Sequence, residues 1–225
     1  FNCCLVNIGD MLMNGTVMNG KMVERPHTFR VAATVATQIM AAVASNQYGG
    51  QSVDCRHFGY FLRRTYERAY AKRLAVYEKR GFAEEEAASL AAEDARAEQE
   101  EDLKAGVQTM QYQINTIMTT NGQAPFVTLF LNIDEADEYA DENAQIVAEI
   151  LRQRIQGIKN EQGVYVTPAF PKLIYVLYPW NNLTGGKYDW VTEIACECSA
   201  KRMYPDYISS KKMKENYEGN VFSCM

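Results

Sequence analysis

A chain of 225 residues is long enough for one large domain or two small ones, and its 47% apolar and 23% charged residues are typical of a globular protein. The net charge of −5 at pH 7 argues against binding of nucleic acid through an extended positive surface, although not against a pocket for a single nucleotide. No run of about 18 apolar residues is present, which excludes a membrane-spanning helix, so the sequence predicts a cytoplasmic protein without a membrane partner.

Short apolar and long helical segments follow one another in the first half of the chain. Residues 3–8 predict a short strand, and the link after it contains two Asn-Gly turn signals. A helix over 26–45 opens at Pro26, and its apolar residues recur every three or four positions to give a face of small side chains. A long helix over 55–80 should end at Gly81.

Helices and strands alternate more regularly in the second half. Residues 84–102 carry nine acidic side chains and predict a solvated helix, and a separate helix is expected over 107–120. Buried strands are predicted over 125–133 and 170–178, and helices over 141–158 and 189–203. This pattern predicts an α/β fold with neighbouring parallel strands, from which the helical stretch 55–120 departs as an excursion suited to a subunit contact.

Motifs that carry chemistry are few. The sequence has no glycine-rich nucleotide loop, nucleophile elbow or zinc-protease motif. Cys196 and Cys198 are separated by one residue, which does not match the ligand spacing of structural zinc sites, so we predict no metal site. We interpret Cys55, Cys196 and Cys198 as buried structural cysteines. Within 119–126, Asn121 and Gln123 place hydrogen-bonding side chains beside a strand and are candidate substrate-binding residues, although a plain Asn-Gly turn explains this segment equally well.

Five segments together resemble one enzyme family. In chain order they are FNCCLVN (1–7), VASNQYGGQS (43–52), INTIMTTNGQAPFVTLF (114–130), FPKLIYVL (170–177) and ECSAKRMYPDYIS (197–209). They resemble the catalytic subunit of the anaerobic (class III) ribonucleoside-triphosphate reductase, a glycyl radical enzyme. The resemblance implies that residues 1–225 are part of a ten-stranded α/β barrel with a long helical excursion. It also implies that an amino-terminal ATP cone, a zinc site and a carboxy-terminal glycyl radical domain lie outside this chain.

The resemblance gives roles to two cysteine positions. In this family a cysteine radical abstracts the 3′ hydrogen of the ribose, and a second cysteine on the opposite side supplies hydrogen and reducing equivalents. Cys3 matches the second cysteine, and Cys4, next on the strand, should point to the other face and be structural. Met225 matches the methionine two residues before the radical cysteine, so the Cα atoms of Cys3 and Met225 are expected within roughly 15 Å.

The resemblance also implies a dimer contact and an allosteric effector site in the helical region 26–120. The positions that match effector contacts are Glu24, His27 and Gln38, and Lys72 is a candidate for the effector phosphates. His27 departs from the family pattern, in which lysine is expected. An exposed acid and a polar helix position explain Glu24 and Gln38 equally well.

The implied function is reduction of ribonucleoside triphosphates to deoxyribonucleoside triphosphates for DNA synthesis. The implied partners are a second copy of the enzyme, a radical S-adenosylmethionine activating enzyme and the missing carboxy-terminal half, and the chain alone should be inactive. The alternative is a non-catalytic nucleotide-binding or assembly half of a split enzyme, because neither radical residue lies within 1–225. Another glycyl radical enzyme acting on a carbon substrate is a third reading that the matched segments favour less.

Overall fold

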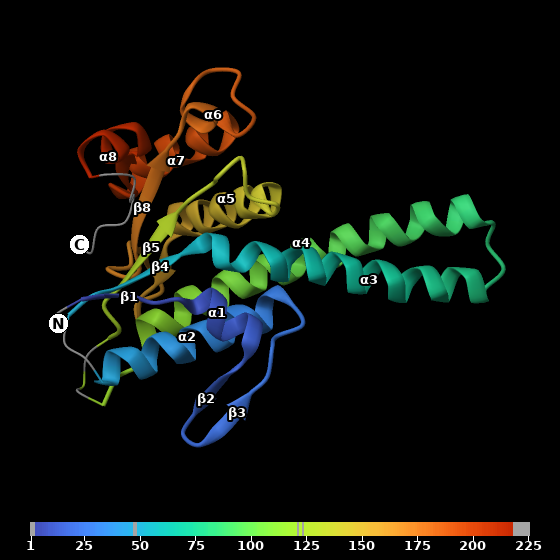
Figure 1. Cartoon of the computed structure of the whole chain (residues 1–225), viewed down its shortest axis with the longest axis horizontal. Coiled ribbons are helices and arrows are strands. Elements are labelled where there is room, and N and C mark those ends of the chain that lie inside the picture. The colour runs from blue at the N-terminus through green and yellow to red at the C-terminus, as the bar shows by residue number, and fades with distance from the viewer. Residues whose placement is uncertain (1–2, 47–48, 121, 123, 218–225) are drawn as a thin grey trace.

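Five parallel strands form the centre of the molecule (Figure 1). The computed structural model describes residues 3–46, 49–120, 122 and 124–217. The sheet runs in chain order through β1 (Cys4–Leu5), β4 (Gln51–Asp54), β5 (Val127–Leu131), β8 (Lys172–Leu177) and β9 (Asp206–Ser209). Every neighbouring pair is parallel, and each crossover contains at least one helix, as parallel pairing requires. The predicted α/β class with neighbouring parallel strands is therefore confirmed.

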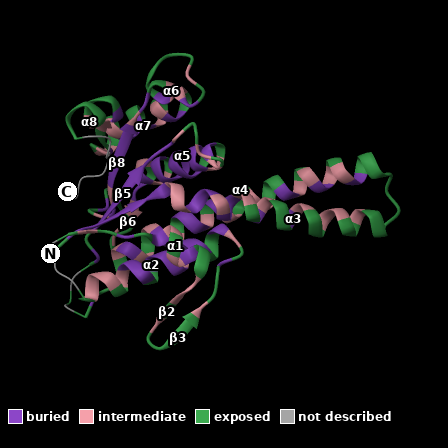
Figure 2. Ribbon diagram, viewed as in Figure 1, coloured by how far each residue is buried: buried purple, intermediate pink, exposed green. Residues whose placement is uncertain are grey.

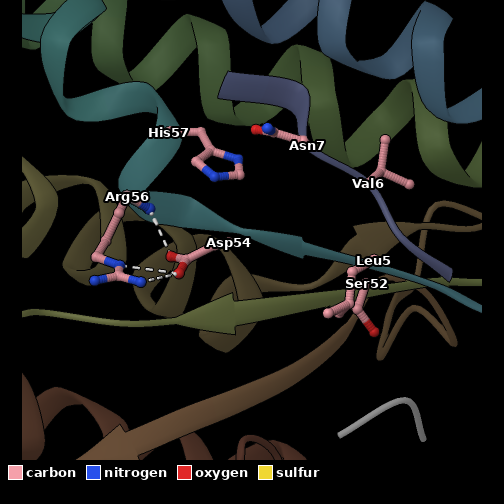
Figure 3. A pocket seen from close by; sticks show the side chains of 7 residues that line it. All are labelled: Leu5, Val6, Asn7, Ser52, Asp54, Arg56 and His57. Atoms are coloured by element: carbon pink, nitrogen blue, oxygen red, sulfur yellow. Dashed lines mark hydrogen bonds and ion pairs between the residues drawn. The ribbon is translucent and has the colours of Figure 1, made fainter. Parts of the chain in front are cut away.

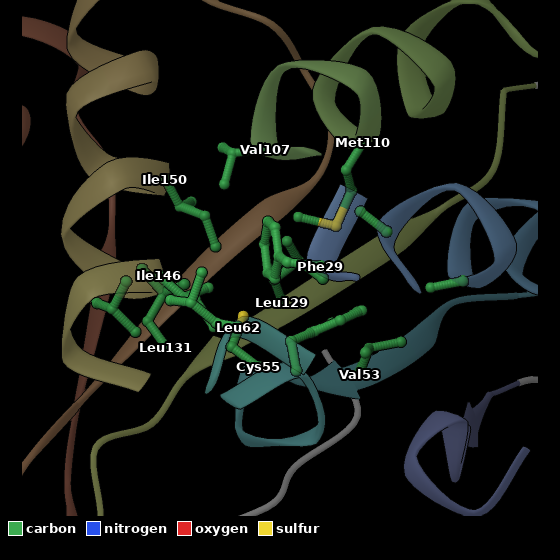
Figure 4. Close-up of a cluster of buried hydrophobic side chains, with 14 of the residues drawn as sticks. Phe29, Val53, Cys55, Leu62, Val107, Met110, Leu129, Leu131, Ile146 and Ile150 are labelled. Carbon is green, nitrogen blue, oxygen red and sulfur yellow. The ribbon is translucent and has the colours of Figure 1, made fainter. Parts of the chain in front are cut away.

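One face of the sheet carries the main hydrophobic core. The helices packed there are α1 (Ile8–Asn14), α2 (Phe29–Asn46), α5 (Ala140–Gln156), α7 (Asp189–Arg202) and the body-proximal parts of α3 (Gly59–Lys79) and α4 (Glu84–Thr116). Figure 4 shows Phe29 of α2 between the sheet residue Leu129 and Met110 of α4. Burying a side chain of this size is worth about 1.5–3 kcal/mol, so this layer holds the sheet and helices together.

Helices α3 and α4 leave the body as an antiparallel hairpin (Figure 1). Ala87, Ala91 and Ala95 lie one turn apart on α4 and are fully buried. Arg73 of α3 forms ion pairs with two acids of α4, at 3.6 Å and 3.4 Å. Away from the body, most hairpin residues are exposed or half-buried (Figure 2). The predicted helix 55–80 is confirmed as the 3-10 turn η1 (Cys55–Phe58) followed by α3.

The prediction of two helices between residues 84 and 120 was wrong, because α4 is continuous from Glu84 to Thr116. Gly106 lies inside this helix, where glycine costs about 1 kcal/mol relative to alanine. A Cβ atom at this position would lie 2.6 Å from the Phe29 ring. The glycine therefore permits close packing of α4 on α2 and does not end the helix.

Residues 10–20, predicted as a link, contain most of α1, which begins at Ile8 within the predicted strand 3–8, and the first strand of a hairpin, β2 (Thr16–Met18) with β3 (Lys21–Val23). Asn19 and Gly20 have φ angles of 49° and 70°, as the tight hairpin turn of an Asn-Gly pair requires. A short helix, α8 (Ser210–Asn216), follows directly after β9. The remaining short elements are β6 (Ile158–Lys159), β7 (Tyr165–Val166) and α6 (Pro179–Asn182).

Arg154 is a buried charge on α5 that holds the segment before β8. Its side chain is 2% exposed and donates hydrogen bonds to the carbonyl groups of Pro168 (2.9 Å) and Pro171 (2.5 Å). Burial lowers the pKa of Arg154 to about 10, although the electrostatic effect of Tyr204, whose ring lies under the guanidinium, acts to raise it. The guanidinium thus remains charged at neutral pH. Among the described residues, no helix is both long enough and apolar enough to cross a bilayer.

Candidate functional site

The sheet has a second face, which points away from the main core. Side chains alternate along a strand, so residues between the core-facing positions of β4, β5 and β8 point to this side. Phe130, Ile174 and Val176 form a separate buried cluster there with Tyr178, and the half-buried Trp180 and Ile208 pack against it. This surface is called the second face below, and it is the face on which the predicted catalytic cysteine belongs.

Cys3 and Cys4 stand at the start of the first strand. Cys4 is half-buried and packs against the main core, while Cys3 is exposed and directly precedes β1. Leu5 is paired with Ser52, whose neighbour Val53 belongs to the main core, so Leu5 points to the second face. By the strand pleat Cys3 shares the direction of Leu5. The expected distance between Cys3 and Met225 involves a residue outside the described part of the chain.

A polar row crosses the sheet next to Leu5. Ser52 is the register partner of Thr128, and Thr128 is the partner of Lys172. Ser52 and Thr128 are 2% and 1% exposed. Within the described residues, neither hydroxyl has a hydrogen-bond partner. The sequence pattern does not predict this row, although Thr128 inside the otherwise apolar β5 was a signal for it.

Charged groups gather at the carboxyl end of β4. Asp54 accepts hydrogen bonds from the backbone N–H of Arg56 (2.9 Å) and from its side-chain Nε (2.9 Å), and Arg56 also pairs with Asp134 at 3.4 Å. Burial opposes the charge of Arg56, but the hydrogen bond and attraction of Asp54 outweigh it and raise the arginine pKa. The Arg56 guanidinium is thus held in its charged form beside the side chains of Asp54 and Asp134.

His57 closes one end of a cavity of about 240 Å³ beside this network. Figure 3 shows the lining residues Leu5, Val6, Asn7, Ser52, Asp54, Arg56 and His57. Burial lowers the pKa of His57. The negative charge of Asp54 acts to raise this pKa and the positive charge of Arg56 acts to lower it further, so the imidazole is neutral at pH 7. Its Nδ1 atom is buried without a partner among the described residues.

All four predicted effector residues are exposed, and one of them, Lys72, lines a cleft. Lys72 of α3 borders a cleft of about 500 Å³ between α3, α4 and the start of α2. Glu24, His27 and Gln38 are not among the residues that line it. Gln38 lies seven residues beyond Val31, a lining residue on the same helix, which is about 10 Å along the helix axis.

The beginning of α2 at this cleft is held by the hairpin. Thr65 of α3 accepts a hydrogen bond from the Phe29 N–H at 2.9 Å, and Asp102 of α4 accepts one from the Arg30 N–H at 3.0 Å. The first N–H groups of a helix have no partner within the helix, so these contacts fix α2 to both arms of the hairpin.

The remaining predicted residues have separate outcomes. Asn121 and Gln123 lie outside the described residues. Cys55 and Cys198 are buried as predicted, and burial raises the pKa of both thiols, that of Cys198 to about 11. The prediction that Cys196 is buried was wrong, because its position on α7 faces outward. In the described part of the chain, no three His, Cys, Asp or Glu side chains are grouped so that they could hold a metal ion.

Comparison with known proteins places the whole chain in one family. Residues 1–225 match the family described as anaerobic ribonucleoside-triphosphate reductase. The enzyme of that name from Enterobacteria phage T4 is 35% identical over 215 residues, covering 95% of this chain and 33% of its own length. The Escherichia coli K12 enzyme is 34% identical over 213 residues, covering 93% of this chain and 27% of its own length.

A solved structure shares the fold. The anaerobic ribonucleotide reductase from Thermotoga maritima, in complex with dATP and CTP, aligns with a TM-score of 0.60 at 11% identity. The alignment covers 94% of this chain and 34% of the Thermotoga chain. The chain therefore spans about a third or less of the proteins it matches, and it belongs to the anaerobic ribonucleoside-triphosphate reductase family.

Proposed function

We propose that the enzyme containing this chain reduces ribonucleoside triphosphates to deoxyribonucleoside triphosphates for DNA synthesis. The observation that carries the proposal is the family match over residues 1–225, and the position of Cys3 supports it. Cys3 is an exposed thiol, and the pleat directs it to the face opposite the main core. Cys55 and Cys198 are unsuited to contact a substrate because both are buried among core side chains.

In this proposal Cys3 acts as a hydrogen donor to the sugar. A thiol S–H bond can give up a hydrogen atom, and sulfur takes part readily in redox chemistry. Cys3 would donate one hydrogen atom to the sugar radical on one side of the ribose as the protonated 2′ hydroxyl leaves as water. A reductant from outside this chain, formate or a thioredoxin-like protein, would supply the two electrons that complete the reduction of the sugar and restore the Cys3 thiol. The glycyl radical of the family, outside this chain, would supply the oxidising equivalent that starts the reaction. Cys4 packs against the core and keeps the strand in place.

The parallel sheet would be one half of the ten-stranded barrel. β1 and β9 are the outer strands of the sheet, which leaves both edges for pairing with further segments of the enzyme. The ATP cone, the zinc site, the radical domain and the missing carboxy-terminal half belong to the rest of the polypeptide in this proposal. The partners would be a second copy of the enzyme and a radical S-adenosylmethionine activating enzyme, in the cytoplasm.

The region 26–120 would carry the dimer contact and bind a nucleotide effector. The cleft beside Lys72 supports this, since Arg68 and Lys72 at its border can attract phosphate groups, whereas Arg30 there is paired with Glu101 and Asp102. Glu24, His27 and Gln38 would complete the effector site from outside the cleft, and the exposure of all three allows it. Asn121 and Gln123 remain proposed substrate contacts in the segment between α4 and β5.

The decisive experiment replaces Cys3 in the complete enzyme. Cys3→Ser should abolish formation of deoxyribonucleotide, measured anaerobically after activation, while equilibrium binding of the ribonucleoside triphosphate stays near the wild-type value. Cys4→Ser is the matched control, because the same change is made one residue away on the core side. Full turnover by Cys3→Ser would show that this cysteine takes no part in the reaction. Loss of activity in both variants through misfolding would appear as lost binding.

A further inference from the structure

Two buried hydroxyl groups on the second face have no hydrogen-bond partner among the described residues: Ser52 Oγ on β4 and Thr128 Oγ1 on β5. By contrast, the buried hydroxyls of Thr37 and Thr65 each donate to a backbone carbonyl of their own helix. Leaving a buried hydroxyl without a partner is unfavourable for folding. Two such groups side by side therefore point to a molecule that binds there.

The register places these hydroxyls between Cys3 and a positive charge. Leu5, Ser52, Thr128 and Lys172 are successive register partners on four neighbouring strands. Cys3 lies two residues before Leu5 and shares its side of the strand. Neighbouring strands are about 4.8 Å apart, so the row extends roughly 14 Å from β1 to β8. This is the scale of a nucleotide whose sugar lies at β1 and whose phosphates extend along the row.

Lys172 supplies the charge that a phosphate requires. Its Nζ atom lies 5.4 Å from the centre of the Phe126 ring, and it makes no ion pair with any residue the structure describes. Hydroxyl and ammonium groups can all donate hydrogen bonds to an oxyanion. The carboxyl end of β4 is unsuited to phosphate, because Asp54 and Asp134 already neutralise Arg56. An anionic group is therefore favoured at the amino-terminal end of the strands.

We propose that Ser52, Thr128 and Lys172 form a subsite for the phosphate groups of the bound nucleoside triphosphate. Ser52 and Thr128 act as positioning residues that donate hydrogen bonds to phosphate oxygens, and Lys172 balances the negative charge. The assignment rests on the proposed function, because it takes the ribose to lie against Cys3. In this assignment, the subsite helps the chain to align the sugar of the substrate with the Cys3 thiol.

The test is substrate binding by variants of the complete enzyme, with the effector site saturated by a deoxynucleoside triphosphate. The Cys3→Ser background prevents turnover during calorimetry. Ser52→Ala combined with Thr128→Val should weaken binding of the ribonucleoside triphosphate by about tenfold, as should Lys172→Met. Binding of the corresponding nucleoside without phosphates should change less than twofold. With Cys3 present, KM should rise by a similar factor while kcat changes less.

Controls separate a binding role from a structural one. Ser52→Thr and Thr128→Ser retain the hydroxyls and should restore most of the affinity. Thr116→Val removes an exposed hydroxyl that donates to the Tyr112 carbonyl on α4, and binding should not change. If the double variant fails to fold, Lys172→Met tests the subsite alone, since its side chain is only half-buried.

The outcomes distinguish this inference from the proposed function. Unchanged triphosphate binding by folded variants would overturn the subsite and leave the role of Cys3 intact. Equal weakening for the triphosphate and the nucleoside would place the hydroxyls against the sugar and would overturn the phosphate assignment. Wild-type turnover by Cys3→Ser would instead overturn the role of Cys3 while the binding data could still support the subsite.

Discussion

The five-stranded sheet and the outer part of the α3–α4 hairpin are stabilised in different ways. The sheet buries large side chains such as Leu129, Phe130 and Tyr175, each worth about 1.5–3 kcal/mol or more of transfer free energy. The outer hairpin buries mainly alanines, and half-exposed ion pairs such as Arg73 with Glu98 join its arms. Alanine, glutamate, lysine and arginine are strong helix formers, so local propensity carries more of the hairpin's stability. The sheet therefore contributes more of the free energy of unfolding, while the outer hairpin presents a charged surface to solvent.

Deletion of one buried leucine should reveal this contrast most strongly. Leu129→Ala on β5 leaves a cavity in the core and should lower the free energy of unfolding by roughly 2–5 kcal/mol. Leu90→Ala, at a half-buried position on α4, should cost about 1 kcal/mol or less because its surroundings are partly solvent. Urea denaturation of the chain measures both. Equal losses would show that the hairpin is as tightly packed as the sheet.

Replacing an arginine in each region should give the next largest difference. Arg154→Met leaves the carbonyls of Pro168 and Pro171 without their buried donor and should cost about 2–3 kcal/mol. Arg73→Met in the hairpin should cost about 0–1 kcal/mol, because the side chain is 42% exposed and its ion pairs are screened by water. The same denaturation experiment, repeated in high salt, should reduce only the smaller effect. A larger loss from Arg73→Met would contradict the comparison.

The smallest effect should come from acid. Burial holds the pKa of His57 below its usual value of about 6.5, so the unfolded chain binds a proton more readily than the folded chain. The free energy of unfolding should therefore fall as pH is lowered from about 6.5 through the lowered pKa, and His57→Gln should remove that part of the decrease. His27→Gln, the same substitution at an exposed histidine, is the matched control. An identical pH profile for His57→Gln and the wild-type chain would rule out this coupling.

Sequence reasoning succeeded where the pattern was long and local. The apolar runs of β5 and β8 and the three-to-four spacing in α2 and α5 led to the correct elements. The continuity of α4 was missed because the need for Gly106 comes from Phe29 of another helix, which no local pattern reveals. The short α1 and the β2–β3 pair were missed because seven and three residues give too little periodicity.

The candidate site was less predictable than the fold. The resemblance directed attention to Cys3, and alternation along a strand predicted that Cys4 lies on the other side. Ser52 and Thr128 read as ordinary strand residues until the register made them neighbours, since 75 residues lie between them in the chain. The pairing of Arg56 with Asp134 likewise depends on two strands lying side by side. Such partners belong to the sheet as a whole and are not encoded in any one segment.

The antiparallel hairpin also affects how the chain can fold and change. Residues 55–126 separate β4 from β5, and closing a flexible loop of that length would cost conformational entropy. Because α3 and α4 pair with each other, local contacts return the chain to the sheet, and the greater length of α4 (33 residues against 21 in α3) carries it to the amino-terminal edge where β5 begins. Removing one turn from each arm would therefore shorten the hairpin without altering the β4–β5 register. The projection is therefore a module whose length can change while the sheet stays the same.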